Sequence, residues 1–379
     1  MEKEKLRKGR KNPSKNTLLR LWLAAGGRCQ FEGCNDNLLK DDITWKTFNG
    51  ANVAHIVAAS SDGPRGNDMS SALSDQLSNL MLLCPKHHKE VDTFVDDYPV
   101  ERLLKMKRLQ EQKVQQLLDG MNYLDVEIMI LESPIKGITD IRVDHEKAVA
   151  ALRSNAQNPA SPYPLLVRID APGQYSSPDY WKALTEKLDS ALKRELHARL
   201  QYDPSMRLAL FPMAPIPLII KLGELLGDKR PIEIFQKTRM PDTWIWQSDE
   251  ATNSFHTEIV KRPEGASDCV ALIISLTAVI AEERVTEVYN ASTIYHLQAS
   301  KNGVDCISSL EDLSLFWHEY QRICDEIKNV NHIDEMALFP AVPISAAFEI
   351  GRRHMPGVHP ILTIYDDNNG FFEALKIGG

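Results

Sequence analysis

Cysteine and histidine residues in the first quarter of the chain have the spacing of metal ligands. Cys29 and Cys34 form a C-x4-C knuckle, and Cys84 and His87 form a C-x2-H pair further along the chain. Two such pairs can close a tetrahedron around Zn²⁺. The segment holds few large apolar residues, so a metal would supply stability that its small core lacks. The spacing therefore predicts a structural zinc site. Three unrelated buried cysteines and a surface histidine are the alternative.

A second candidate metal site adjoins the first. The first 120 residues hold only three histidines, His55, His87 and His88. His55 lies in Val53–Val57, a run predicted to form a strand. If the segment after Cys84 is helical, His88 and Asp92 are four residues apart and share a face, as two ligands of one cation should.

Together these residues resemble the HNH, or ββα-metal, nucleases in the subgroup that also carries a structural zinc. The family pattern is A-H-I, then N-L-x-x-L-C, then a C/H-H pair with a ligand four residues later, and its pieces occur in order between residues 26 and 97. The resemblance implies that His55 is the general base and that Asn79 braces the loop bearing it. It also implies that His88 and Asp92 hold Mg²⁺ or another divalent cation.

Two positions depart from that family pattern. Ala54 stands where many members carry a metal-binding acid or histidine, and Asp92 stands where histidine is common. The cation would then have two protein ligands, with water and phosphate completing its shell. A zinc-stabilised module that binds DNA without cutting it is the alternative.

Basic side chains around these motifs suit a DNA backbone. Arg65, in a Gly-rich loop after the base, and Lys86 and Lys89, beside the histidine pair, are expected to contact phosphates. Arg28 and Lys86 would also offset the negative charge of the zinc group. Residues 1–120 hold 19 Lys and Arg against 16 Asp and Glu, whereas the remainder holds 25 against 36. A duplex-binding surface is therefore expected on the first part. No recognition helix is evident in the sequence, so we expect cleavage with little sequence preference.

The rest of the chain alternates short apolar runs with amphipathic segments. Strands are predicted at residues 126–131, 165–169, 208–210, 232–235, 270–276, 293–297, 337–339 and 361–365, and helices at 178–196, 217–226, 310–328 and 344–354. Apolar runs of this kind are typical of strands buried on both faces, and their alternation with helices predicts parallel sheets in an α/β fold.

One pattern occurs twice in this half. Ala209–Ile216 (ALFPMAPI) recurs 128 residues later as Ala337–Ile344 (ALFPAVPI), and Gly223 and Gly351 follow at the same offset. Pro231-Ile232 and Pro360-Ile361 follow at an offset one residue longer. The repeat predicts two fused Rossmann-like units, whose pseudo-twofold symmetry suits a ligand of similar symmetry. A recurring turn at a strand end is the alternative.

Nearly the whole chain after about residue 15 resembles the HNH–SAVED effectors of bacterial cyclic-oligonucleotide antiphage signalling (CBASS). The resemblance rests on the order of the two parts, the AHIVAAS-x-DGPRG string and the ALFP-x-x-PI repeat. It implies a small zinc-bound ββα-metal (HNH) nuclease domain, followed by a SAVED domain of two fused Rossmann-like, CARF-like units. It further implies that a cyclic di- or trinucleotide activates degradation of double-stranded DNA with little sequence specificity, in abortive infection.

Candidate ligand contacts are residues in loops that follow predicted strands. Basic groups would meet phosphates, and aromatic faces would stack on bases. The nominated residues are Lys237, Arg239, Trp244, Trp246, Gln298, Lys301 and Tyr365. Ordinary core packing is the alternative for the two tryptophans.

The domain organisation follows from these patterns. We expect a flexible basic arm at residues 1–16, the nuclease domain at 17–98, a connecting helix and linker at 99–122, and the sensor domain at 123–379, with repeats at 123–265 and 266–379. Thr17–Ala25 is predicted to be a helix with Thr17 as its cap. The helix at Pro99–Leu118 could pair with its copy in a homo-oligomer.

Localisation and competing functions complete these expectations. The first residues lack an apolar core and no apolar run reaches eighteen residues, so we expect a cytoplasmic protein that does not contact membranes. One alternative function is that of a restriction-type HNH enzyme whose C-terminal half recognises modified DNA, although the net negative charge of that half counts against it. A non-catalytic zinc signalling adaptor that binds DNA is another.

Overall fold

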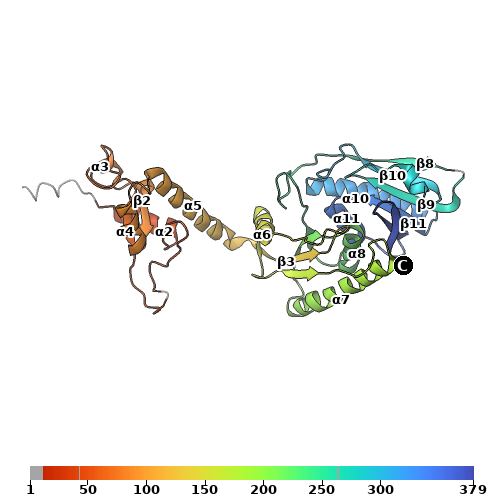
Figure 1. Cartoon of the computed structure of the whole chain (residues 1–379), viewed down its shortest axis with the longest axis horizontal. Coiled ribbons are helices and arrows are strands. Elements are labelled where there is room, and N and C mark those ends of the chain that lie inside the picture. Colours follow the sequence, from red (N-terminus) through yellow and green to blue (C-terminus); the bar gives the residue numbers. More distant parts are fainter. Residues whose placement is uncertain (1–11, 42, 263) are drawn as a thin grey trace, which may run out of the picture. The chain divides into compact units, whose positions relative to one another are not determined.

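A computed structural model describes residues 12–41, 43–262 and 264–379 of the chain (Figure 1). It consists of two compact units, Met1–Asn122 and Tyr123–Gly379. Most of the basic arm predicted at residues 1–16 lies outside the described residues, but Lys15 and Asn16 already belong to a helix. No described helix has the length and hydropathy needed to span a membrane.

The first unit is built around a two-stranded antiparallel sheet. Helix α2 (Lys15–Ala25) precedes strands β1 (Asn52–His55) and β2 (Leu80–Leu83), and the short helix α3 (Ser70–Leu73) lies between the strands. Helices α4 (Pro85–Thr93) and α5 (Val100–Asp119) follow, and α5 ends in a 3₁₀ turn, Gly120–Asn122. The core joins α2, both strands, α4 and the start of α5 through Leu21, Ala25, Ala54, Leu80, Leu82, Val91, Leu103 and Met106.

Helix α2 begins earlier than the sequence pattern predicts. Ser14, and not Thr17, is its N-cap, because the Ser14 hydroxyl accepts a hydrogen bond from the Thr17 amide at 3.1 Å. Gly26 ends the helix in the left-handed region, with φ at 61°. This conformation is costly for residues with a Cβ atom, so glycine suits the position.

The second unit contains two sheets. The first sheet is parallel, with strand order β4-β3-β6-β7 and β5 also paired to β3. Its strands are β3 (Leu124–Glu132), β4 (Gln157–Pro159), β5 (Leu165–Arg168), β6 (Leu208–Met213) and β7 (Ile232–Ile234). Helices α6 (His145–Ser154), α7 (Pro178–Tyr202) and α8 (Ile216–Leu226) connect them.

The second sheet has the order β13-β12-β11-β9-β10-β8. Four central strands are mutually parallel: β9 (Ala266–Ser275), β10 (Ala291–Ala299), β11 (Glu335–Ala341) and β12 (Ile361–Asp367). The edge strands β8 (Phe255–Lys261) and β13 (Phe371–Ile377) are antiparallel to their neighbours. The helices are α9 (Glu282–Thr286), α10 (Leu310–Asp325), which continues into a π turn at Glu326–Val330, and α11 (Ile344–Arg352).

These sheets confirm the α/β class with parallel strands, and each of the eight predicted strands is present. Strands β4, β8 and β13 were missed. Strand β8 exposes most of its side chains, so it lacks the apolar run of a buried strand. Because β8 pairs with β10, it belongs to the second sheet, whereas the sequence analysis placed residues 255–261 in the first repeat.

The two ALFP patterns occupy equivalent places, each at a strand end that leads into a helix. Ala209 on β6 pairs with Glu233 on β7, and Ala337 on β11 pairs with Thr363 on β12. The offset between repeats is therefore 128 residues in one strand and 130 in the next, so the offset of 129 inferred from Pro-Ile is one residue short. Ring stacking supports the same two offsets. The ring centroids of Phe235 and Phe211 are 4.6 Å apart in the first repeat, and those of Tyr365 and Phe339 are 4.5 Å apart in the second.

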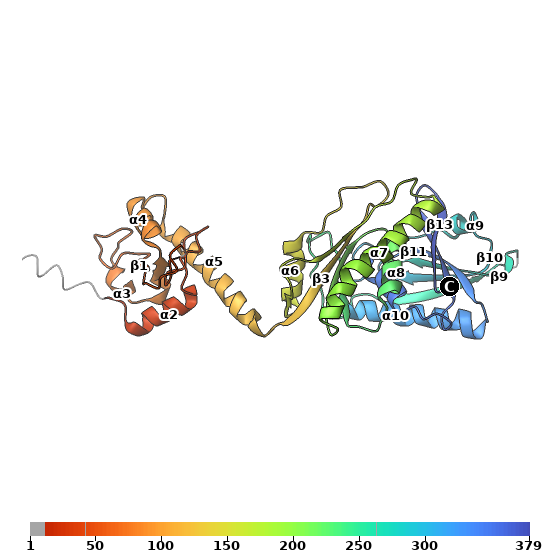
Figure 2. The ribbon, with the colours of Figure 1, turned by 90° about the horizontal axis from the view of Figure 1, so that it is seen from below.

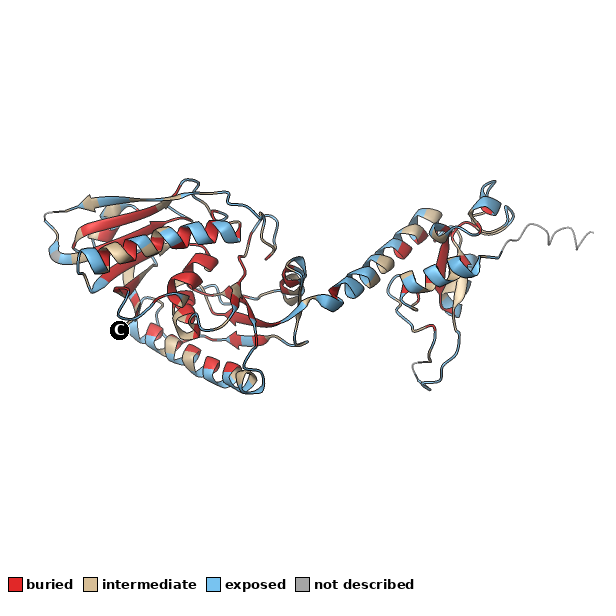
Figure 3. Cartoon of the chain, turned by 180° about the vertical axis from the view of Figure 1, so that it is seen from behind, coloured by how far each residue is buried: buried red, intermediate tan, exposed pale blue. Residues whose placement is uncertain are grey.

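Helices α8 and α11 lie side by side in the middle of this unit, between α7 and α10 (Figures 1 and 2). A Cβ on Gly223 would lie 2.3 Å from the Phe348 carbonyl oxygen, and one on Gly351 would lie 1.8 Å from the Ile220 carbonyl oxygen. Phe348 is Ile220 shifted by 128, so the contacts are reciprocal, as a pseudo-twofold axis requires. Helix α8 is buried almost all round, whereas α7 and α10 each expose one face (Figure 3).

Candidate functional site

The predicted zinc ligands lie together in the first unit. The ligand atoms of Cys29, Cys34, Cys84 and His87 are all within 4.8 Å of one another, the one group of three or more such ligands among the described residues. His87 Nδ1 is 3.2 Å from Cys84 Sγ and 3.7 Å from Cys29 Sγ. A tetrahedron with Zn–S bonds of 2.3 Å places its ligand atoms roughly 3.7 Å apart. The group therefore could hold zinc.

Neighbouring groups orient these ligands. The Cys84 amide lies 3.3 Å from Cys29 Sγ and donates to it, and Phe31 stacks on His87 at 4.1 Å, which fixes the plane of the imidazole. Burial raises the pKa of the Cys29 thiol to about 12. A cation must therefore displace a proton from this thiol, which makes metal binding weaker as the pH falls. Arg28 lies beside the group and donates to the Asn35 carbonyl oxygen at 3.2 Å.

His55 and Asn79 are held by backbone groups of the same loops. His55 Nε2 lies 3.0 Å from the Ser74 carbonyl oxygen. A carbonyl oxygen only accepts, so in the neutral ring Nε2 carries the hydrogen and Nδ1 keeps a free lone pair. The buried Asn79 accepts from the Val57 amide and donates to the Val57 carbonyl oxygen, both at 2.8 Å. This amide therefore ties down the loop that follows the histidine strand.

His88 and Asp92 share one face of α4, because the segment after Cys84 is helical. His88 Nε2 is 3.8 Å from Asp92 Oδ2, and the side chains are 34% and 39% exposed. They can offer one nitrogen and one carboxylate oxygen to a cation that solvent can reach. Ala54, on β1, is buried and supplies no ligand atom.

Arg65 differs from the sequence-based expectation. Its side chain is 5% exposed, and it donates to the Ile56 and Val91 carbonyl oxygens at 2.7 and 2.8 Å. It also forms a 3.1 Å ion pair with Asp92. These partners occupy the guanidinium inside the unit, so Arg65 braces the loop and is not free to clamp a phosphate. Lys86 and Lys89 on α4 are exposed, as phosphate contacts require.

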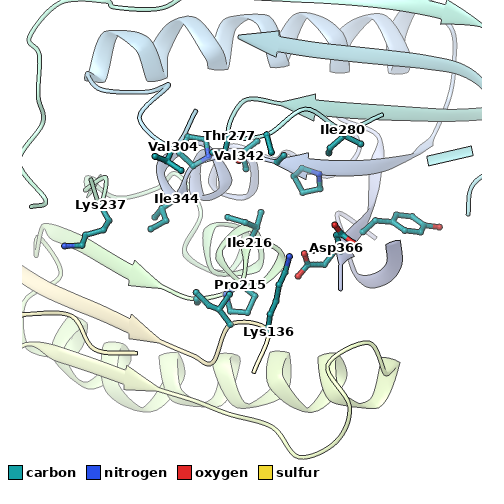
Figure 4. Close-up of a pocket in the computed structure, with 18 of the residues that line it drawn as sticks. Lys136, Pro215, Ile216, Lys237, Thr277, Ile280, Val304, Val342, Ile344 and Asp366 are labelled. Carbon is teal, nitrogen blue, oxygen red and sulfur yellow. Dashed lines mark hydrogen bonds between the residues drawn. The ribbon is translucent and has the colours of Figure 1, made fainter. Parts of the chain in front are cut away.

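The second unit contains a cavity of about 510 Å³ at the carboxyl ends of β6 and β11. Met213–Ile216 and their repeat equivalents Ala341–Ile344 line it from the two halves, at the start of α8 and α11 (Figure 4). The described lining includes four cationic and two acidic side chains: Lys136, Lys237, Arg239, Arg284, Asp366 and Asp367. Parallel sheets place ligand sites at this edge.

The structure separates the seven nominated ligand residues. Lys237, Arg239 and Tyr365 line the cavity. Trp244 does not, because it is buried in the core with its ring 5.3 Å from that of Phe211. Trp246 packs at the edge of the main core.

The remaining two nominated residues lie at the end of β10 and just after it, and they are not among the residues that line the cavity. Gln298 and Lys301 come from the end of β10, which is separated from β11 by β9. Lys301 Nζ donates instead to the Thr252 carbonyl oxygen at 3.0 Å. Sequence reasoning missed Lys136, Arg284 and Asp366. Asp366 lies at the end of β12 and Lys136 soon after β3, so their places near strand ends could have indicated them, whereas Arg284 lies on α9 and had no such signal.

Acidic and basic groups are paired around the cavity. The Tyr175 hydroxyl donates to Asp366 Oδ2 at 2.5 Å, and burial raises the pKa of the Asp366 carboxyl. Arg284 pairs with Asp367 at 3.0 Å. Lys237 pairs with Asp242, and hydrogen bonds from two lysines lower the pKa of Asp242 to about 2.

Residues 184–377 match the SAVED family model, described as the SMODS-associated and fused to various effectors sensor domain. The chain is also similar in fold to the Acinetobacter baumannii Cap4 SAVED/CARF-domain containing receptor. Its structure with the cyclic trinucleotide 3′3′3′-cAAA aligns at 15% identity and a TM-score of 0.44, covering 77% of this chain and 61% of that one. The structure of the same receptor with the cyclic trinucleotide 2′3′3′-cAAA aligns at 13% identity and a TM-score of 0.42, covering 76% of this chain and 61% of that one.

The Moraxella osloensis Cap4 SAVED/CARF-domain containing receptor aligns at 14% identity and a TM-score of 0.39, covering 76% of this chain and 60% of that one. The chain thus spans about three-fifths of the length of these receptors. No curated protein matches it significantly.

Proposed function

This chain belongs to the SAVED family of sensor domains, and on this premise we propose that it is a DNA endonuclease activated by a cyclic oligonucleotide in CBASS antiphage defence. The cavity between the two repeats carries the sensor part of the proposal. It lies where the carboxyl ends of β6 and β11 meet the starts of α8 and α11, and four cationic side chains line it. This arrangement suits an anionic ligand that spans both repeats, and a cyclic di- or trinucleotide has that form.

The nuclease part of the proposal rests on the first unit. Strands β1 and β2 pair and are followed by helix α4, as in a ββα-metal site, with the short helix α3 inserted between the strands, and the Cys29–Cys34–Cys84–His87 group would hold a structural zinc. His55 Nδ1, with its lone pair free, would take the proton from the attacking water. Asn79 would keep that imidazole in place through its two bonds to Val57.

His88 and Asp92 would hold the catalytic cation, Mg²⁺ or a similar ion. When bound there, such an ion polarises the scissile phosphate and stabilises the leaving 3′-oxygen. Lys86 and Lys89, exposed on the same helix, would contact neighbouring phosphates of double-stranded DNA. Homo-oligomer formation belongs to the proposal, because α5 exposes Leu109, Leu117 and Leu118.

A non-catalytic zinc adaptor is a second candidate, and one observation favours it. Arg65 already forms an ion pair with Asp92 Oδ1, so part of the charge of this carboxylate is balanced before a cation binds beside His88. In this reading the first unit binds DNA without cutting it.

One experiment separates these functions. Supercoiled plasmid is incubated with the full chain and Mg²⁺, with and without a panel of cyclic di- and trinucleotides, while light scattering follows oligomer size. We expect cutting only with an activating nucleotide and at least a 100-fold loss in His55→Ala, with nucleotide binding unchanged. His332→Ala in the second unit is the control histidine. Equal cutting with and without nucleotides would exclude gating, and undiminished cutting by His55→Ala would remove His55 from the mechanism.

A further inference from the structure

The two halves of the cavity carry different chemical groups at equivalent positions. Phe235 and Tyr365 are equivalent, because each stacks on the phenylalanine of its own ALFP pattern. The next residues along the two strands are then equivalent as well. The first repeat places Gln236 and Lys237 at the cavity, and the second places Asp366 and Asp367 there.

A proline explains why the two halves bond differently. Gln236 Oε1 accepts a hydrogen bond from the Ser345 amide, in the first turn of α11, at 3.0 Å. The equivalent position in the first turn of α8 is Pro217, which has no N–H to donate. Asp366 therefore cannot form the symmetry-related bond. It accepts instead from the Tyr175 hydroxyl and from the Asp367 amide, the latter at 2.8 Å.

These bonds leave the carboxylate able to accept more. Each carboxylate oxygen has two lone pairs, and Tyr175 uses one on Oδ2 while Asp367 uses one on Oδ1. Asp366 and Lys136 face one side of the cavity, and Lys237 lies on the opposite side (Figure 4). The cavity therefore has a carboxylate that can accept further hydrogen bonds at one end and Lys237 at the other.

We propose that Asp366 determines the specificity of the cavity by accepting a hydrogen bond from an uncharged donor of the ligand, an amino group of a base or a ribose hydroxyl. The inference rests on the proposed function, in which the cavity binds a cyclic oligonucleotide. The negative charge of Asp366 disfavours a phosphate in direct contact with it, so the phosphate lies near Lys237 and Arg239 and the ligand binds in one orientation despite the pseudo-twofold fold. A ligand that lacks the donor leaves the remaining lone pairs of this half-buried carboxylate without a partner, and it therefore binds more weakly.

A simpler role makes the opposite prediction. If Asp366 only balances the charge of Lys136, then removing its charge strengthens the binding of every polyanionic ligand. If it accepts from a specific donor, the same change weakens the binding of the preferred ligand. Asp367 is the matched control, because it carries the same charge, lies next in the chain and pairs with Arg284.

The test measures binding of the full chain by calorimetry. The probes are the 3′3′3′- and 2′3′3′-linked cyclic adenosine trinucleotides, together with analogues that lack one 6-amino group or one free ribose hydroxyl. For Asp366→Asn we expect affinity for the preferred probe to fall about 10- to 100-fold, since a charge-assisted bond is lost. The preference over the analogue that lacks the recognised donor should fall to near unity, and the analogue concerned identifies the donor as amino or hydroxyl.

The controls decide the other outcomes. Asp367→Asn should keep the preference, and Tyr175→Phe, which leaves the carboxylate in place without its hydroxyl partner, should reduce it partly. Equal or tighter binding by Asp366→Asn with the preference intact would overturn the inference and leave the proposed function standing. If Asp366→Asn does not fold, an unchanged preference in Tyr175→Phe overturns it instead. A native chain that binds neither these probes nor any member of the panel of cyclic di- and trinucleotides would overturn both.

Discussion

Replacing Gly351 with alanine tests the pseudo-twofold contact that joins the two repeats. A Cβ at this position would lie 1.8 Å from the Ile220 carbonyl oxygen and 3.0 Å from the Glu224 amide nitrogen. Non-bonded heavy atoms need about 3.5 Å, so α8 and α11 must move apart by roughly 1.7 Å. Overpacking of this kind costs about 1–3 kcal/mol or more.

Helix propensity acts in the opposite direction. Alanine is favoured over glycine inside a helix by about 0.5–1 kcal/mol. We therefore expect Gly351→Ala to lower the free energy of unfolding of the second unit by about 1–2 kcal/mol. Urea unfolding measures this, with the fluorescence of Trp181 and Trp244, which are buried in that unit, as the signal.

Gly223, the equivalent glycine in the first repeat, provides a second test of the same contact. Gly223→Ala places its Cβ 2.3 Å from the Phe348 carbonyl oxygen, so its cost should be similar or somewhat smaller. The double variant should cost less than the sum, because helices already separated accept the second methyl group more easily. If Gly351→Ala is as stable as the native chain or more stable, then helix propensity dominates and the close-contact reasoning is wrong.

Three further predictions concern single side chains. Cys84→Ser should lower the zinc content measured by mass spectrometry and destabilise the first unit. The control Cys269→Ser, in the second unit, should change neither the zinc content nor the stability of the first unit. A full zinc complement in Cys84→Ser would contradict the proposed ligand set. Asn79→Ala should lower the free energy of unfolding by about 1–3 kcal/mol, because it leaves buried Val57 groups unpaired. His55→Ala should lower it by less than about 1 kcal/mol, although under the proposed function both variants stop DNA cleavage; equal stability of the two variants would argue against the bracing role. Burial alone would raise the pKa of Asp312, but amide hydrogen bonds from Ser308, Thr252 and Asn253 outweigh it and hold the pKa below its usual range. The stability from this carboxylate is therefore present above pH 4 and lost as the pH falls through the lowered pKa, so the gap between native and Asp312→Ala in urea unfolding should narrow from pH 7 to pH 2.5 and would be constant if these bonds contributed nothing.

Much of the fold could be predicted because its signals are local. Buried parallel strands form short apolar runs, and the eight runs found in the sequence are all strands. Strand β8 could not be found in this way, because it lies at a sheet edge and alternates exposed and half-exposed side chains. Its pairing with β10 also moved the boundary between the repeats.

The candidate metal groups could be proposed for the same reason. Cys29 and Cys34 lie on one short turn, Cys84 and His87 on the first turn of α4, and two local pairs need only one tertiary contact to meet. The orientation of the Arg65 side chain could not be predicted from the sequence. Its guanidinium turns inward because the Ile56 and Val91 carbonyl oxygens, brought together from distant segments, accept its hydrogens.

The sequence by itself determined the two pairs of the Cys/His group, the histidine face of α4 and the repeat, since each is visible as spacing along the chain. Only the tertiary structure decided which residues meet at the cavity. Tyr175 and Asp366 are 191 residues apart, and no pattern along the chain relates them. The repeat predicted a symmetric site, and Pro217 broke the symmetry. A missing amide hydrogen in α8 left a carboxylate facing the cavity where the other half has an amide.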